Sequence, residues 1–148
     1  MKLKIPSVAA ITLMFPLLAG CAISGRAYQP EPVPKAPLAA IYLYRPYHFY
    51  GSAIAPAVAC AGQAVPLKPG GYTAIYARPG PQICTASTEA VSELKFNVEP
   101  GRNYFIREEI VPGNIIGRAH FALADSDTAH KQIAKCHEQT IPDPDLNR

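Results

Sequence analysis

The chain has 148 residues, with 14 Lys and Arg against 11 Asp and Glu, which gives a formal net charge of +3. This length fits one domain with a modest core. The basic residues are scattered along the sequence and form no run. The charge pattern therefore argues against a nucleic-acid footprint and against a polybasic membrane patch, and we expect no nucleic acid among the partners.

Residues 1–20 have the features of a secretory signal peptide. A basic start at Lys2 and Lys4 precedes an apolar stretch that is too short and too interrupted by proline to span a bilayer. The stretch ends in Leu18-Ala19-Gly20-Cys21, which resembles the bacterial lipobox. In that motif the chain is cut before the cysteine, whose thiol takes a diacylglyceryl group and whose freed amine takes a third acyl chain. We therefore predict lipidation at Cys21, and three chains exceed what stable membrane attachment needs.

The mature protein is expected to lie on the outer membrane and to face the periplasm. Ala22 follows the cysteine where retained inner-membrane lipoproteins commonly carry Asp, so the resemblance to the enterobacterial sorting pattern implies the outer membrane. Because Lys2 and Lys4 leave with the signal, 12 basic residues then face 11 acidic ones. The apparent basicity of the chain is mostly a property of its signal peptide.

A proline-rich segment follows the cysteine. Between residues 26 and 37 the chain has Pro30, Pro32, Pro34 and Pro37, a pattern incompatible with a helix or a central strand. Such sequence favours an extended conformation of roughly 3 Å per residue. We therefore interpret residues 21–37 as a lipidated tether that holds the domain some tens of ångströms off the lipid surface.

Residues 38–148 are predicted to form a single all-β domain with a short C-terminal helix and tail. Short apolar or alternating runs are separated by Pro and Gly, as in Glu93–Val98, where every second residue is apolar. The runs predict a small β-sandwich of about seven strands: 38–45, 56–61, 72–78, 81–87, 92–98, 103–111 and 117–123. The helix is expected over Thr128–Glu138, capped by Asp127, with Ala129, Ile133 and Cys136 facing inward.

Four segments of this domain carry a family resemblance: Tyr42–Pro46, Leu67–Tyr72, Arg78–Gly80 and Val98–Arg107. They resemble a bacterial lipoprotein family named domain of unknown function 2846, over roughly residues 38–125. Gln82 and Cys60 depart from the family pattern, which usually has a His or an aromatic residue at the first position and an aliphatic residue at the second. The resemblance implies a β-sandwich and an envelope location, but no substrate.

Lipidation of Cys21 leaves three thiols in a compartment that oxidises them. Alternation along the expected strands points Cys60 and Cys84 to one side of each strand, within bridging reach if the two strands face one another. We expect these two to form a disulfide. Two alternatives stay open: a bond between Cys84 and Cys136, which would join the helix to the sheet, or three buried free thiols.

Aromatic residues are concentrated around the end of the first strand. Alternation places Tyr42 and Tyr44 opposite the neighbouring aliphatic residues, so an inward aliphatic face would leave an exposed tyrosine stripe suited to a partner. Equally, the tyrosines could fill the sandwich core while the aliphatic face packs on a helix. Arg45 offers its guanidinium either to a partner or to the carbonyls of the following loop. The candidate partner-binding residues are Tyr42, Tyr44, Arg45, Tyr47 and Tyr50.

The titratable residues form no recognisable catalytic or metal-binding pattern. His130 and His137 are two helical turns apart, about 10 Å, which is too far to chelate one ion. Glu108 and Glu109 face opposite sides of their strand, so they cannot act on one substrate as acid and base, and we interpret Glu108 or Glu109 as a surface charge. We therefore expect no enzyme activity, metal ion or cofactor.

Two functions remain for a protein attached to the membrane through its N-terminal lipid. The first is a non-enzymatic envelope lipoprotein whose sandwich binds another protein or helps to assemble an envelope complex. The second is a module that binds peptidoglycan or another polysaccharide. The sequence names no partner for either function.

Overall fold

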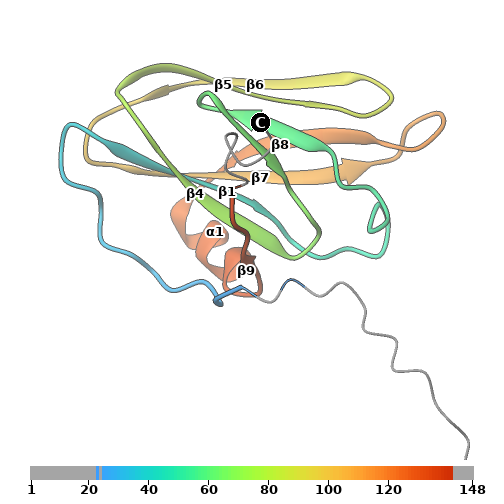
Figure 1. Cartoon of the computed structure of the whole chain (residues 1–148), viewed down its shortest axis with the longest axis horizontal. Helices are drawn as coiled ribbons and strands as arrows, with labels where there is room; N and C mark the ends of the chain where they lie inside the picture. Colours follow the sequence, from blue (N-terminus) through green and yellow to red (C-terminus); the bar gives the residue numbers. More distant parts are fainter. Residues whose placement is uncertain (1–22, 24, 142–148) are drawn as a thin grey trace, which may run out of the picture.

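The computed structural model describes residue 23 and residues 25–141, which form two sheets and one helix (Figure 1). The strands are β1 (Ala39–Arg45), β2 (Ala57–Cys60), β3 (Gln63–Pro66), β4 (Gly71–Ala77), β5 (Gly80–Ser87), β6 (Val91–Val98), β7 (Asn103–Val111), β8 (Arg118–Ala124) and β9 (His137–Glu138), and the helix is α1 (Ser126–Ile133). The signal peptide, Cys21 and the end of the C-terminal tail lie outside the described residues.

The two sheets pack face to face. One has the strand order β8-β7-β1-β4-β9, and the other has the order β3-β2-β5-β6. Paired strands run antiparallel, except that β1 is parallel to β7 and β4 is parallel to β9. The residues buried between the sheets include Ile41, Leu43, Val58, Ile75 and Ile106. The expected all-β sandwich with one short C-terminal helix is confirmed.

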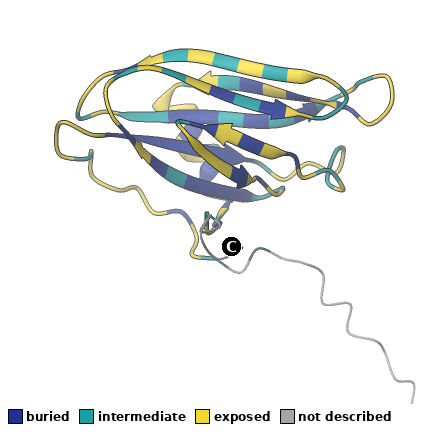
Figure 2. Cartoon of the chain, turned by 45° about the horizontal axis from the view of Figure 1, so that its top comes forward, coloured by how far each residue is buried: buried dark blue, intermediate teal, exposed yellow. Residues whose placement is uncertain are grey.

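Strand β1 is buried on both faces, which makes its sheet the middle layer of the domain (Figure 2). Ile41 and Leu43 point toward the second sheet, whereas Tyr42 and Tyr44 pack on the other side in a cluster with Ala129 and Ile133 of α1. A strand that is covered on both sides needs side chains suited to burial at nearly every position. Strand β1 meets this requirement by alternating aliphatic and aromatic residues.

Two short strands, β3 and β9, were not expected from the sequence. Strand β3 pairs with β2 through a tight turn at Ala61 and Gly62, which have φ angles of 48° and 78°. Strand β9 has two residues and exists because it pairs with the start of β4. Segments of two to four residues are too short to show a period, so only their pairing identifies them as strands.

The predicted helix boundaries were wrong at both ends. The helix begins at Ser126 because Asp125, not Asp127, is the N-cap, and its carboxylate accepts a hydrogen bond of 2.9 Å from the backbone N–H of Thr128. It ends at Ile133 because the chain then turns to pair with β4. Cys136 lies beyond the end of the helix, yet it is buried, in agreement with its predicted inward orientation.

The disulfide predicted between Cys60 and Cys84 is present. The two residues are directly opposite one another on the paired strands β2 and β5, so the bond lies within one sheet rather than between two sheets. Cys136 is the free thiol among the described residues. Burial raises the pKa of the Cys136 thiol to about 11, which keeps it protonated and unreactive.

Part of the segment interpreted as a tether belongs to the fold. Ala27 forms a β-bridge with His137, and the backbone N–H of Glu138 donates to the carbonyl of Arg26 at 2.8 Å. The ring of Tyr28 is buried and packs edge-on against Tyr42 and Tyr72. The domain boundary expected at residue 38 is therefore too late. From residue 26 onward, backbone hydrogen bonds to β9 and the packing of Tyr28 on the sheet attach the chain to the domain.

Candidate functional site

Two of the five candidate partner-binding residues lie in the core. Tyr42 and Tyr44 are 2% and 0% exposed, because α1 and Tyr28 cover the face of β1 on which they lie. Burial raises the pKa of Tyr44 to about 12, and its hydroxyl donates a hydrogen bond of 2.7 Å to Oε1 of Gln132. The prediction that they bind a partner was wrong, because the sequence did not reveal which layer covers the tyrosine face.

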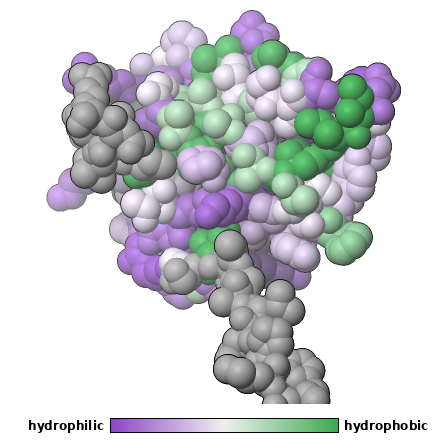
Figure 3. Space-filling view, turned by 45° about the vertical axis from the view of Figure 1, so that its right-hand side comes forward, coloured by the Kyte–Doolittle hydropathy of each residue, from purple (hydrophilic) through white to green (hydrophobic). Residues whose placement is uncertain are grey.

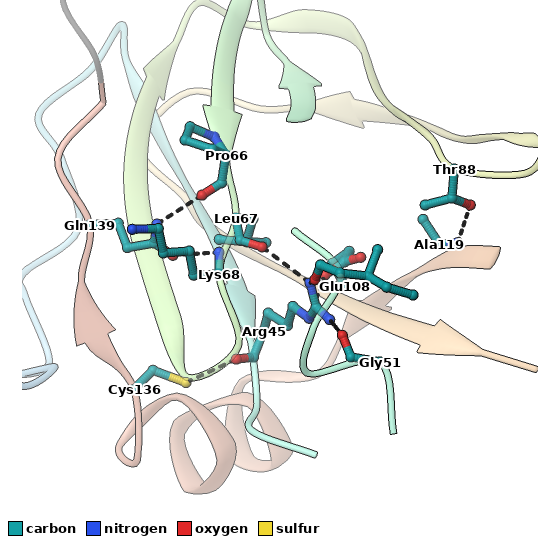
Figure 4. Close-up of polar contacts among 11 residues, drawn as sticks. Arg45, Gly51, Pro66, Leu67, Lys68, Thr88, Glu108, Ala119, Cys136 and Gln139 are labelled. Atoms are coloured by element: carbon teal, nitrogen blue, oxygen red, sulfur yellow. Dashed lines mark hydrogen bonds and ion pairs between the residues drawn. The ribbon is translucent and has the colours of Figure 1, made fainter. Parts of the chain in front are cut away.

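Arg45 is also buried, at 3% exposure, and it stabilises the loop that follows β1 (Figure 4). Its guanidinium donates hydrogen bonds to the carbonyls of Ile54 at 2.7 Å, Gly51 at 2.8 Å and Leu67 at 3.2 Å. Of the two roles considered for Arg45, the structure supports the attachment of the loop and contradicts direct contact with a partner.

Glu108 completes this buried polar group. Its Oε2 lies 3.2 Å from Nε of Arg45, and its side chain is 0% exposed. Neither carboxylate oxygen has a hydrogen-bond partner. Burial away from water raises the pKa of Glu108 to about 7, although the charge of Arg45 opposes the shift. The interpretation of Glu108 as a surface charge was wrong, because the pairing of β7 with β1 turns it toward Arg45 between the sheets. Glu109, on the other face of β7, is only partly buried.

The loop held by Arg45 carries exposed aromatic side chains. Phe49 is 88% exposed, Tyr47 is 66% exposed and Tyr50 is 50% exposed. Tyr47 and Tyr50 are thus the two candidate partner-binding residues that remain accessible. Because Arg45 fixes the backbone of this loop at Gly51 and Ile54, these rings project from an ordered loop.

A second loop, between β7 and β8, presents two exposed aliphatic residues. Ile115 is 86% exposed and Ile116 is 50% exposed. The carboxylate of Glu89 accepts hydrogen bonds from the backbone N–H groups of residues 114–116, at 2.7 to 3.2 Å, and from Nε of Arg118 at 3.0 Å. These bonds lower the pKa of Glu89 to about 2, so it stays ionised and holds the loop.

The two loops are neighbours and together form what we call the end surface, defined by Tyr47, Phe49, Tyr50, Ile115 and Ile116. Gly117 of the β7–β8 loop lies beside the side chain of Tyr50, because a Cβ built on Gly117 would be 3.3 Å from the Tyr50 hydroxyl. The β7–β8 loop therefore contacts the loop that follows β1, which we call the aromatic loop. Figure 3 brings this side of the molecule forward and shows strongly hydrophobic groups, in green, exposed among more polar neighbours in white and purple. A large exposed apolar patch is typical of an interaction site.

An open groove lies at the other end of the β5–β6 hairpin. Its volume is about 570 Å³. Pro81, Ile83 and Phe96 supply much of its apolar lining, and it is also lined by Ala61, Gly62, Gln82, Lys95 and Asn97. The size is within the range of ligand sites, and an apolar floor with a polar rim is typical of interfaces.

Sequence reasoning misjudged Glu108 and missed Glu89 and the two isoleucines of the end surface. A signal for the isoleucines was present, because Ile115 and Ile116 stand between glycines in a turn-rich segment. Nothing comparable marks Glu89, whose partners come from a different hairpin. Within the described ranges, no three His, Cys, Asp or Glu side chains gather closely enough to hold a metal ion, and no helix is long and apolar enough to cross a membrane.

No family model matches the chain, and no curated protein or solved structure matches it. The resemblance to the lipoprotein family therefore stays a prediction. The features that bear on function are the sequence motif at Cys21, the disulfide, the end surface and the groove.

Proposed function

We propose that this protein is a lipid-anchored, non-enzymatic binding module of the bacterial envelope, attached to the outer membrane through Cys21 and facing the periplasm. The segment Leu18–Cys21 supports the anchor, because it has the residue pattern of a lipoprotein processing site. The Cys60–Cys84 disulfide supports an oxidising compartment such as the periplasm.

The observation that carries the binding function is the presence of two apolar surfaces at opposite ends of a small domain. The end surface lies where β1 and β7 end, whereas the groove lies beside Pro81 and Asn97, which pair at the far end of the β5–β6 hairpin. A module with this shape can contact two components of the envelope at once. We assign the groove to a segment of another envelope protein.

The chemistry of the groove favours a peptide segment. Ile83 is 41% exposed and lies on the same outward face of β5 as the exposed Pro81, so an apolar side chain of a partner would find two nonpolar contacts in the groove. The side chains of Gln82, Lys95 and Asn97 add hydrogen-bonding groups around them. An apolar centre with a polar rim is the usual composition of a protein interface.

A second candidate function is the binding of peptidoglycan or another polysaccharide in the same groove. The observation that favours it is the polar set on the outward face of β6, because Lys95 and Asn97 could hydrogen-bond to sugar hydroxyls while Pro81 and Ile83 contact a sugar face. The two functions differ in what the groove captures in the cell.

Site-specific photocrosslinking separates these functions. A photoreactive residue is placed at Ile83 in the groove, and a matched control is placed at Leu123, which is 51% exposed on β8 and outside the groove. We expect one discrete protein adduct from position 83 and none from position 123. Equal labelling from both positions would contradict a protein site in the groove, and co-sedimentation of the detergent-solubilised chain with purified sacculi, abolished by Lys95→Ala, would favour the polysaccharide function.

A further inference from the structure

The point at which the N-terminal segment joins the domain lies at the same end as the end surface. Arg45 pairs with Gly71, Gly71 pairs with His137, and His137 bridges to Ala27, so these four residues form one row across neighbouring strands. At about 4.8 Å per strand, Ala27 lies about 14 Å from the end of β1. Tyr47 of the end surface lies beside this row. A Cβ built on Gly70, the neighbour of Gly71 in the chain, would be 3.9 Å from the Cβ of Tyr47.

The chain between Cys21 and this row is short. Among the residues that the structure describes, Arg26 is the first whose backbone pairs with β9, through the carbonyl that accepts from the N–H of Glu138. Five residues of fully extended chain reach at most about 18 Å, so a lipid on Cys21 must lie within that distance of the β9 edge. The prolines that suggested a long spacer come after the attachment point at residues 26–28 and cannot lift the domain from the membrane.

We propose that the end surface rests on the bilayer that holds the lipid of Cys21, with Phe49 and Ile115 inserted at the level of the headgroups. This inference depends on the proposed lipid anchor. It assigns the bilayer to the end surface and leaves the groove, at the opposite end, directed toward the periplasm.

The chemistry of this end suits a lipid surface. Tyrosines are enriched at membrane interfaces because the ring is apolar and the hydroxyl is polar, and Phe49 and Ile115 supply the nonpolar groups. Lys68 and Lys135 are exposed beside the row formed by Gly71 and His137, where they can meet anionic headgroups.

The acidic residues described near this end are already engaged. Glu138 pairs with Arg26 at 3.4 Å, and Glu89 is occupied by Arg118 and by the loop it holds. Glu108 is enclosed beneath the aromatic loop. They therefore present little free negative charge to oppose anionic lipids. Arg45 and Glu89 also order the two loops before contact, which reduces the conformational entropy lost when the apolar side chains are immobilised.

The chain contains no Trp, so a single Trp can report on its own surroundings. Phe49→Trp places the reporter in the end surface. Tyr76→Trp is the matched control, because Tyr76 is 53% exposed and pairs with Ala40 near the opposite end of β1. Each full-length lipidated variant is purified and reconstituted into vesicles of phosphatidylethanolamine and phosphatidylglycerol with brominated acyl chains. Its melting temperature is compared with that of the wild type, and Ile115→Trp replaces Phe49→Trp if that variant fails to fold.

We expect blue-shifted emission from Trp at position 49 and quenching by the brominated lipid at least about twofold stronger than at position 76. Equal quenching at the two positions in an acylated chain overturns the membrane contact and leaves the lipid anchor intact. A blue shift without quenching also overturns it, because another copy of the protein would then cover the end surface. An intact mass without acyl chains overturns the anchor and, with it, this inference.

Discussion

Replacing Arg45 with Ala is the change that most directly tests how the aromatic loop is held. The substitution removes the donors to three loop carbonyls and leaves the carboxylate of Glu108 buried without its cation. Breaking a buried ion pair from one side costs about 3 to 5 kcal/mol. For a domain of this size we expect the melting temperature to fall by about 10 to 15 °C.

The assay is thermal unfolding followed by circular dichroism on the full chain. Arg102→Ala is the matched control, because Arg102 pairs with Glu99 at 3.0 Å but is 66% exposed, and exposed pairs contribute about 1 kcal/mol or less. The double variant Arg45→Met with Glu108→Leu should recover part of the loss, since it removes the uncompensated charge while the carbonyls still lack donors. A melting temperature for Arg45→Ala equal to that of Arg102→Ala would refute the reasoning.

Three further changes test other parts of the fold. Replacing Cys60 and Cys84 together by Ser should lower the free energy of unfolding by about 3 kcal/mol in denaturant melts, because the unfolded chain loses its crosslink, and an unchanged value would contradict this. Glu89→Gln should raise the hydrogen-exchange rate of the Ile115 amide about tenfold. In the wild type, folding lowers the pKa of Glu89, so this amide should be fully protected above pH 4.5 and lose its protection as the pH falls toward 2. Folding raises the pKa of Glu108 from 4.5 to about 7, so the folded state binds the extra proton and wild-type stability should fall as the pH rises through this interval. Glu108→Gln should flatten that decrease in melting curves recorded across the interval, and an unchanged slope would contradict it.

Local patterns in the sequence were enough to predict the sandwich and seven of its strands, because alternation and turn residues act over a few positions. They favoured the pairing of Cys60 with Cys84 but left a bond between Cys84 and Cys136 open. They could not show what covers each face. Alternation allowed an inward aliphatic face that includes Ile41, and the structure has that face. The burial of Tyr42 on the other face depends on α1 and Tyr28, which come from other parts of the sequence. Such coverage is a long-range property that alternation alone does not encode.

The binding residues show the same limit. Arg45 was singled out correctly as a residue with a specific task, but its role depends on Glu108, which lies 63 positions later and reaches it through the parallel pairing of β1 with β7. The length of the tether was overestimated for a related reason. Proline content indicates an extended chain, and it does not show that Tyr28 is packed against the sheet.

The mass of the mature N-terminus tests the central claim most directly, because the anchor, the position of the domain on the bilayer and the direction of the groove all depend on it. We predict that the protein isolated from membranes begins at Cys21 and carries a thioether-linked diacylglyceryl group and an amide-linked acyl chain. Cys21→Ser should lose both groups and stay uncut. A mature chain that begins elsewhere, or an unmodified thiol at Cys21, would contradict the account.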